Sequence, residues 1–175
     1  MLTERRIREL FVSLNEELAR RQVRGEAYLA GGAVMCLVFH ARPATKDVDA
    51  MLVPATEMRA AAHAVAMLEG LSDDWLNDAV KGFFSERGEF ELFEELSNLR
   101  IYTPDPGYLF AMKCLAMRLG EQFQDLNDVA VLARELGLHT VAEAESILGQ
   151  YYSLDRYPAK ARYLLEELLV DDRRS

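Results

Sequence analysis

The sequence predicts an α/β fold (α+β) in which helices flank a small mixed β-sheet and a helical C-terminal part follows. Three observations support this prediction. An apolar run meets Gly31-Gly32, passes into a helix-like segment and is followed by a second apolar run; residues 3–22 repeat apolar positions at helical spacing; and the C-terminal third is helical in pattern. We expect residues 1–104 to form the α/β core with its N-terminal helix, and residues 105–175 to form a helical part packed on that core.

The composition is that of a globular protein. Half of the 175 residues are hydrophobic and 28% are charged, which is enough apolar material for a core. No apolar run approaches the ~20 residues of a membrane span, and the charged start of the chain is unlike a signal peptide, so we expect a cytoplasmic protein without a membrane partner. The net charge of −9 argues against broad DNA or RNA binding, although a local basic patch is compatible with it.

Cysteine and histidine usage adds two expectations. Cys36 and Cys114 lie within apolar helical patterns, so we expect buried free thiols. The three histidines show no metal-ligand spacing, which argues against a zinc site.

In the first part of the chain, the elements follow from apolar periodicity and from the residues that stop it. Gly25 ends the first helical pattern, Pro43 ends the helix after the glycines, and Pro54 closes the strand that contains two aspartates. Thr56 is suited to cap the next helix, with Gly70 after its end. The elements expected are a helix over 3–22, a strand beginning at 27–30, a helix over 33–40, a strand over 47–53, a helix over 56–68, and strands over 89–96 and 99–102.

Residues 72–81 allow two interpretations. Trp75, Asn77, Asp78 and Lys81 combine an aromatic ring with an amide, an acid and a base, a set that can stack on a nucleobase and read it. The alternative, which we favour, is a capped short helix in which Trp75 anchors the core.

The C-terminal third carries helix start and stop signals. Thr140 and Glu143 fit a capping box, Gly149 is expected to stop that helix, and Pro158 is expected to start the last one. Three tyrosines in this part could line a nucleotide pocket, although packing between helices is the safer interpretation. These tyrosines are Tyr151, Tyr152 and Tyr157.

Asp47 and Asp49 are spaced i, i+2 in an apolar run. On an extended strand such side chains project to the same face, and two adjacent carboxylates repel unless a cation lies between them. Oxygen ligands of this kind suit Mg²⁺, which usually takes one or two carboxylates plus substrate phosphates, with Mn²⁺ as an alternative. The sequence therefore predicts that Asp47 and Asp49 are metal ligands.

Gly31 and Gly32 fit the other half of a nucleotide site. Glycine allows a tight turn and a close approach of the ligand, and the start of the following helix offers free N–H groups to an anion. Thr45 and Lys46 lie just before the aspartates, where they can bind phosphate oxygens; a role as ordinary loop residues is equally open. Arg42 is also a candidate phosphate contact, although a solvated surface arginine is the favoured interpretation.

This combination resembles the DNA polymerase β-like nucleotidyltransferases, whose motif is a hydrophobic residue, Gly-Gly or Gly-Ser, a spacer, and Asp-x-Asp or Asp-x-Glu. The matching residues are Leu29, Gly31, Gly32, Asp47 and Asp49. The likeness is strongest to small bacterial nucleotidyltransferase-like proteins, including the AbiEii-type toxins of abortive infection, and it covers about residues 26–133. Many family members carry a third carboxylate on a later strand, for which Glu91 and Glu94 are the candidates here, although neither stands in a clear apolar-Asp-apolar context.

A second motif lies further along the chain. Lys113 is placed among apolar residues and needs a partner or an anion, and Asp125 and Asp128 follow at i and i+3. The pair of motifs resembles the helical Lys motif and the Asp-x-x-Asp motif of AbiEii-type proteins. That resemblance implies that Lys113 contacts nucleotide phosphates and that Asp125 or Asp128 orients it or acts as a base. The alternative is structural: a Lys113–Asp128 salt bridge with Asp125 as a helix cap, and Arg118 fits either version.

Together these motifs predict Mg²⁺-dependent transfer of an NMP group from an NTP to an acceptor hydroxyl on RNA or protein, with pyrophosphate leaving. By resemblance, the setting would be a toxin–antitoxin or phage-defence pair, with an antitoxin protein as partner. The rival function is a catalytically inactive module of the same fold that binds a nucleotide or a protein. A third acidic side chain close to Asp47 and Asp49 would favour the enzyme.

Overall fold

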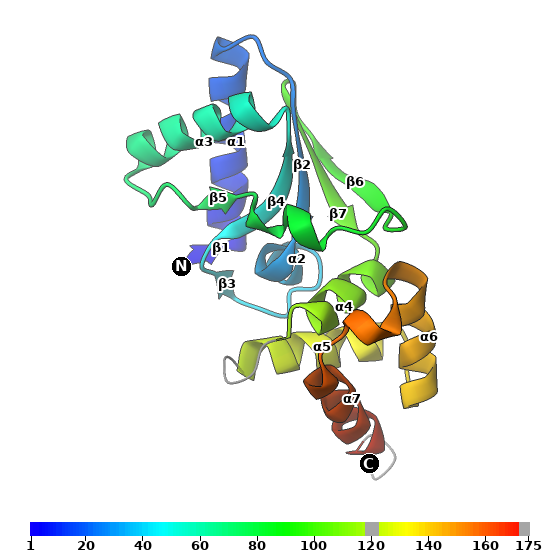
Figure 1. Cartoon of the computed structure of the whole chain (residues 1–175). Helices are drawn as coiled ribbons and strands as arrows, with labels where there is room; N and C mark the ends of the chain where they lie inside the picture. The colour runs from blue at the N-terminus through cyan, green and yellow to red at the C-terminus, as the bar shows by residue number, and fades with distance from the viewer. Residues whose placement is uncertain (118–122, 172–175) are drawn as a thin grey trace. The chain divides into compact units, whose positions relative to one another are not determined.

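The computed structural model describes residues 1–117 and 123–171, which form two compact units (Figure 1). The first unit comprises Met1–Gly82 and Phe90–Pro104, and the second comprises Phe83–Glu89 and the chain from Asp105 onward. The mixed sheet flanked by helices lies in the first unit and the helical part is the second, which confirms the predicted fold class. No helix among the described residues is long and apolar enough to cross a membrane.

The first unit is built from strands and three α-helices. Its strands are β1 (Leu2–Thr3), β2 (Gly25–Ala30), β3 (Ala44–Thr45), β4 (Val48–Val53), β5 (Leu76–Asn77), β6 (Phe90–Glu95) and β7 (Leu99–Pro104). Its helices are α1 (Glu4–Arg20), α2 (Gly31–Leu37) and α3 (Ala55–Glu69). The 3-10 helix η1 (Ala79–Phe83) follows β5, and the first stretch of this unit ends within it, at Gly82.

The five-stranded sheet has the order β5-β4-β2-β7-β6. β2 pairs antiparallel with β4 and parallel with β7, while β5 is parallel to β4 and β6 is antiparallel to β7, so the sheet is mixed. The short strands β1 and β3 form a separate antiparallel pair in which Leu2 lies opposite Thr45. The start of the chain is thereby joined to the loop that leads into β4.

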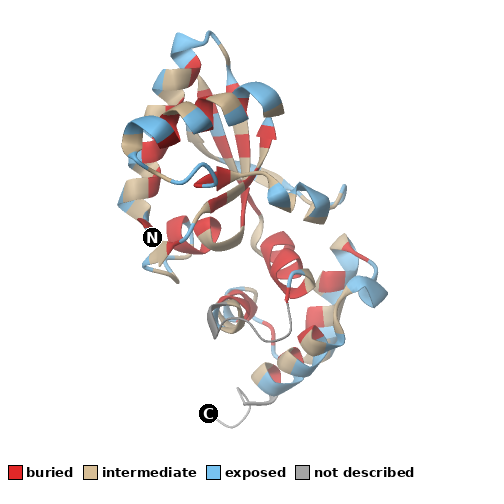
Figure 2. Cartoon of the chain, turned by 60° about the vertical axis from the view of Figure 1, so that its left-hand side comes forward, coloured by how far each residue is buried: buried red, intermediate tan, exposed pale blue. Residues whose placement is uncertain are grey.

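The core of this unit lies between one face of the sheet and helices α1 and α3, which contact each other as well as β7 and β4 respectively. The inward stripe of α1 is the one that its sequence spacing predicts: Ile7, Leu10, Phe11, Leu14 and Leu18 are fully buried. Gly25 permits close packing here, because a Cβ at this position would lie 2.1 Å from Met58 Sδ of α3. Buried residues accordingly run along the strands and the inner sides of these helices in Figure 2.

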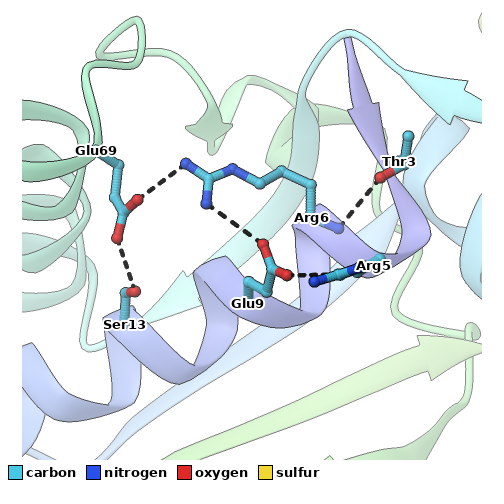
Figure 3. Close-up of polar contacts among 6 residues, drawn as sticks. All are labelled: Thr3, Arg5, Arg6, Glu9, Ser13 and Glu69. Atoms are coloured by element: carbon cyan, nitrogen blue, oxygen red, sulfur yellow. Dashed lines mark hydrogen bonds and ion pairs between the residues drawn. The ribbon is translucent and has the colours of Figure 1, made fainter.

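A polar network joins α1 to the end of α3 (Figure 3). The Arg6 guanidinium and the Ser13 hydroxyl donate to the two oxygens of Glu69, at 2.9 and 3.1 Å. Thr3 caps α1 by accepting a hydrogen bond from the Arg6 backbone N–H. Partly exposed ion pairs of this kind contribute at most about 1 kcal/mol each, so the network adds little to the stability of the unit.

The segment 72–81 differs from its predicted short helix. Leu76 and Asn77 form β5, which adds to the sheet edge beside β4, and η1 follows. Trp75 is buried, with 2% of its surface exposed, and its indole N–H donates to the Ala62 carbonyl at 3.0 Å. The favoured interpretation of Trp75 as a core anchor is therefore confirmed.

The boundaries around the glycines also differ from prediction. Gly31 and Gly32 are the first residues of α2, and Asp47 precedes β4, which begins at Val48. Pro54, not Thr56, is the N-cap of α3, and it supplies no side-chain hydrogen bond because proline has no donor or acceptor in its ring. Gly70 follows α3 in the left-handed conformation, as predicted.

The second unit is helical. Its elements are α4 (Pro106–Leu115), α5 (Phe123–Glu135), α6 (Val141–Tyr151), the 3-10 helix η2 (Leu154–Arg156) and α7 (Ala159–Asp171). The capping box of α6 is confirmed, with Thr140 and Glu143 bonded to each other's backbone N–H groups, but Gly149 does not stop the helix. Every residue of α4 from Gly107 to Cys114 is buried, and Cys114 is a free thiol whose burial raises its pKa to about 12.

The segment Phe83–Glu89 packs on tyrosines of this unit. The Ser85 backbone N–H donates to the Tyr108 hydroxyl at 2.7 Å, and the Ser85 hydroxyl donates to the Tyr151 carbonyl at 2.6 Å. Gly88 passes directly over the Tyr108 ring, where a Cβ would lie 2.0 Å from Cε1. This part of the chain therefore belongs to the second unit although it separates β5 from β6.

Replacement of Trp75 by phenylalanine tests its role as an anchor. Trp75→Phe removes the donor to the buried Ala62 carbonyl and leaves a small void, so we expect the free energy of unfolding in urea to fall by about 1–3 kcal/mol. Nucleotide affinity, measured by calorimetry on the folded variant, should not change. A loss of affinity with undiminished stability would instead support the base-stacking interpretation.

Candidate nucleotide and metal site

The centre of the candidate site is a close approach between the glycine corner and a carboxylate. β2 ends at Ala30, whose register partner on β4 is Asp49. The next residue, Gly31, has a φ of 65°, and a Cβ there would lie 2.6 Å from Asp49 Oδ2. Only glycine tolerates both this backbone conformation and this contact.

The second glycine borders the loop that precedes the aspartates. A Cβ on Gly32 would lie 2.6 Å from Thr45 Oγ1 and 3.0 Å from Arg42 Nη1. Thr45 is 5% exposed and is held in place by its pairing with Leu2 of β1. A hydroxyl, a guanidinium and the glycine backbone therefore converge at one point.

Asp47 occupies an electrostatically unfavourable position. Burial raises the pKa of its carboxyl, the nearby carboxylate of Asp74 raises it further, and the ammonium of Lys46 opposes both effects. Because the pKa of Asp47 is raised on folding, its ionisation destabilises the folded protein progressively as the pH rises from the ordinary pKa to the raised one, and the penalty persists at higher pH. A bound cation would relieve this penalty, and protons would compete with that cation as the pH falls.

The donor set suits a hard cation. Asp47 and Asp49 offer carboxylate oxygens, the ligand type that Mg²⁺ prefers, and Mg²⁺ commonly needs only one or two carboxylates when phosphates supply the rest. Among residues 1–117 and 123–171, no preformed cluster of three or more His, Cys, Asp or Glu side chains is found. Two carboxylates alone would leave the remaining ligand positions of Mg²⁺ to substrate phosphates or water.

The structure places neither sequence candidate for a third carboxylate beside Asp49. Glu91 and Glu94 lie on β6, which β2 and β7 separate from β4, and Glu94 pairs with Arg8 at 3.2 Å. The residue in register with Asp49 on the neighbouring strand β5 is Asn77. The sequence pattern assigned no catalytic role to Asn77, because a two-residue strand produces no periodic signal, and none to Asp74, which lies in the turn before that strand.

In the second unit, Lys113 lies between two carboxylates of α5. Its ammonium is 2.7 Å from Asp128 Oδ2 and 3.3 Å from Asp125 Oδ1. The Asp128 side chain is fully buried and 10% of the Lys113 side chain is exposed. The ion pair of the structural alternative is thus present, while Arg118 lies outside the described residues.

The three tyrosines use their hydroxyls within the second unit. Tyr151 donates to Asp105 Oδ1 at 3.1 Å, Tyr157 donates to the Leu148 carbonyl at 2.9 Å, and Tyr152 donates to the Phe83 carbonyl. Burial raises the pKa of Tyr151 to about 12 and also raises the pKa values of the other two. These interactions support packing between helices.

Comparison with models of known protein families, with curated proteins and with solved structures finds no match. The case for a function therefore rests on the residues themselves.

The glycine corner provides a prediction with a matched control. Gly31 and Gly70 share a φ of 65°, but no atom lies within 4 Å of a Cβ at Gly70. Alanine at either position should lower the free energy of unfolding by about 1–2 kcal/mol through the left-handed backbone alone. Gly31→Ala should in addition displace the Asp49 carboxylate and abolish Mg²⁺-dependent nucleotide binding, measured by calorimetry, whereas Gly70→Ala should bind normally. Equal binding by the two variants would contradict this account of the corner.

The buried pair in the second unit gives another prediction. Lys113→Met alone leaves Asp128 buried without its ammonium, so unfolding should become easier by about 3–5 kcal/mol. The double variant Lys113→Met/Asp128→Leu removes both charges and should recover most of that loss in urea denaturation. A double variant as unstable as the single one would show that Lys113 stabilises the unit by some other contact.

Proposed function

We propose that this chain is a nucleotidyltransferase related to the DNA polymerase β-like superfamily, using Mg²⁺ or Mn²⁺ to move an NMP group from an NTP to an acceptor hydroxyl of RNA or protein. The single observation that supports it best is the 2.6 Å approach between the Cβ position of Gly31 and Asp49 Oδ2. This contact holds the Asp49 carboxylate against the backbone of the glycine turn. A metal bound by the carboxylate would then lie close to a phosphate bound at the turn.

Each residue of the first-unit site has a role in this proposal. Asp47 and Asp49 would hold the metal, which would supply positive charge to offset that of the phosphates, and Thr45 and Lys46 would contact phosphate oxygens. Arg42, beside Gly32, adds a second cation. The acceptor oxygen forms a bond to the α-phosphorus, the bond to the β-phosphate oxygen breaks, pyrophosphate leaves, and the acceptor proton passes to a carboxylate or to water.

A second function, a nucleotide-binding module without turnover, is favoured by one specific observation. Asn77 stands in register beside Asp49, and an amide cannot take the proton of the acceptor hydroxyl. Asp74, close enough to Asp47 to raise its pKa, is the carboxylate that would keep the enzyme active. We further propose that the protein acts in the cytoplasm, which supplies NTPs and Mg²⁺. Its proposed partner is an antitoxin protein.

The deciding experiment is calorimetric titration of the four NTPs with and without Mg²⁺. We expect Mg²⁺-dependent binding by the unaltered protein, a loss of at least about tenfold in Asp47→Asn and Asp49→Asn, and none in Asp155→Asn, an exposed carboxylate of the second unit. Affinity should fall as the pH drops through the raised pKa of Asp47, because protons displace the metal.

Stability provides the internal control for this experiment. Without metal, Asp47→Asn should unfold at the same temperature as the unaltered protein or higher at neutral pH, because it removes a carboxylate whose ionised form is disfavoured. Nucleotide binding that is indifferent to both aspartates and to Mg²⁺ would overturn the proposal. If the protein binds NTPs but releases no pyrophosphate in the presence of RNA and protein acceptors, the result would support the second function, the nucleotide-binding module without turnover.

A further inference from the structure

The loop that joins α2 to β4 carries three of the candidate phosphate contacts. We call residues 38–47 the phosphate loop. Arg42, Thr45 and Lys46 lie in it, and among its residues, all of which the structure describes, only the two of β3 form a strand. A loop of this kind takes its conformation largely from the elements packed against it. The elements that hold the loop therefore decide where its phosphate contacts lie.

The last part of the phosphate loop is held by the start of the chain. β1 pairs antiparallel with β3, with Leu2 opposite Thr45, and both strands are labelled near α2 in Figure 1. Leu2 and Thr45 are each 5% exposed, so this pairing is shielded from solvent. A Cβ on Gly32 would lie 2.6 Å from Thr45 Oγ1. β1 thereby fixes the position of a hydroxyl beside the glycine corner.

The first part of the phosphate loop is held by the first residue of α1. Glu4 Oε2 lies 3.2 Å from His40 Nδ1, and Glu4 Oε1 lies 3.1 Å from Arg8 Nη2, one turn further along the helix. His40 has a φ of 50°, so the chain passes through the left-handed region shortly after the end of α2. Thr3, directly before Glu4, is the N-cap of α1. The start of one helix therefore holds the loop at two points, His40 and Thr45.

α1 gives this short strand its support. A pair of two-residue strands is at most marginally stable in water, but β1 runs directly into a helix of 17 residues whose apolar stripe is buried. The Glu4 and His40 side chains are 37% and 66% exposed, so their contact adds little to the free energy of unfolding. Removing that contact should therefore release the loop without unfolding the unit.

We propose that residues 2–4 are a positioning element for the phosphate loop. They touch no phosphate themselves. They hold the Thr45 hydroxyl and the Arg42 guanidinium, whose Nη1 lies 3.0 Å from the Cβ position of Gly32, where both groups receive the phosphates of a nucleotide. The inference rests on the proposed function. Because a loop held in its binding conformation loses less entropy on binding, releasing it weakens affinity for the triphosphate group and leaves the preference among bases unchanged.

Glu4→Ala tests the positioning element without removing a buried side chain. We expect it to weaken Mg²⁺-dependent binding of the four NTPs and of inorganic tripolyphosphate by the same factor, at least about threefold, in calorimetry. Hydrogen exchange of the backbone amides of residues 38–47, followed by mass spectrometry, should become faster. Glu4→Gln keeps an oxygen beside His40 and should recover most of the affinity.

Glu9→Ala is the matched control. Glu9 lies on the same helix, is similarly exposed and pairs with two arginines, Arg5 at 2.9 Å and Arg6 at 3.5 Å (Figure 3). Among the residues that the structure describes, it has no hydrogen bond or ion pair with the phosphate loop. Glu9→Ala should therefore unfold at a temperature similar to that of Glu4→Ala while changing neither the affinity nor the exchange of the loop.

The outcomes separate the inference from the proposed function. Binding by the unaltered protein that is unchanged in Glu4→Ala overturns the inference alone, even if the loop exchanges faster. Weaker binding without faster exchange, an equal loss in Glu9→Ala, or a loss for NTPs but not for tripolyphosphate overturns it as well, because Glu4 would then act other than by holding the loop. Absence of binding by the unaltered protein rejects the proposed function and the inference with it.

Discussion

The contact between Gly31 and the Asp49 carboxylate is the constraint on which the first unit depends. β2 must end opposite Asp49, and the chain must then turn into α2 directly beneath the carboxylate with a φ of 65°. Any side chain at this point would separate the two central strands or displace the carboxylate. The missing Cβ of Gly31 therefore allows the Asp49 carboxylate to lie against the start of α2.

The phosphate side of the site depends on a longer-range interaction. Thr45 is buried because Leu2, at the start of the chain, pairs with it, and α1 begins at once from its cap Thr3. The loop that carries Arg42 and Thr45 is therefore held between α2 and the N-terminal strand instead of lying free in solvent. Preorganised side chains of this kind lose less conformational entropy when they bind an anion.

Local patterns were sufficient for the fold class, the inward stripe of α1 and the capping box of α6, because each follows from spacing within a few residues. Local patterns could not predict which side chains are brought together by the order of the strands in the sheet. Asn77 lies in register with Asp49 only through a two-residue strand, and Glu91 and Glu94, the weak sequence candidates for a third carboxylate, lie on β6 at the far edge of the sheet. The sequence singles out the two aspartates as candidate ligands, but β4 begins after Asp47, where burial and Asp74 disfavour its charge.

The chain passes between the two units three times, after Gly82, Glu89 and Pro104, and this has a consequence for dissecting the protein. A gene fragment ending at residue 104 would contain the strap 83–89 but not the Tyr108 ring beneath Gly88 or the Tyr151 carbonyl that Ser85 binds. The complementary fragment would begin with those tyrosines uncovered. Neither fragment therefore contains a complete unit, so recombination or truncation at residue 104 would not transfer either unit intact. A single proteolytic cleavage within residues 83–89 would leave the two units covalently joined through Pro104 and Asp105.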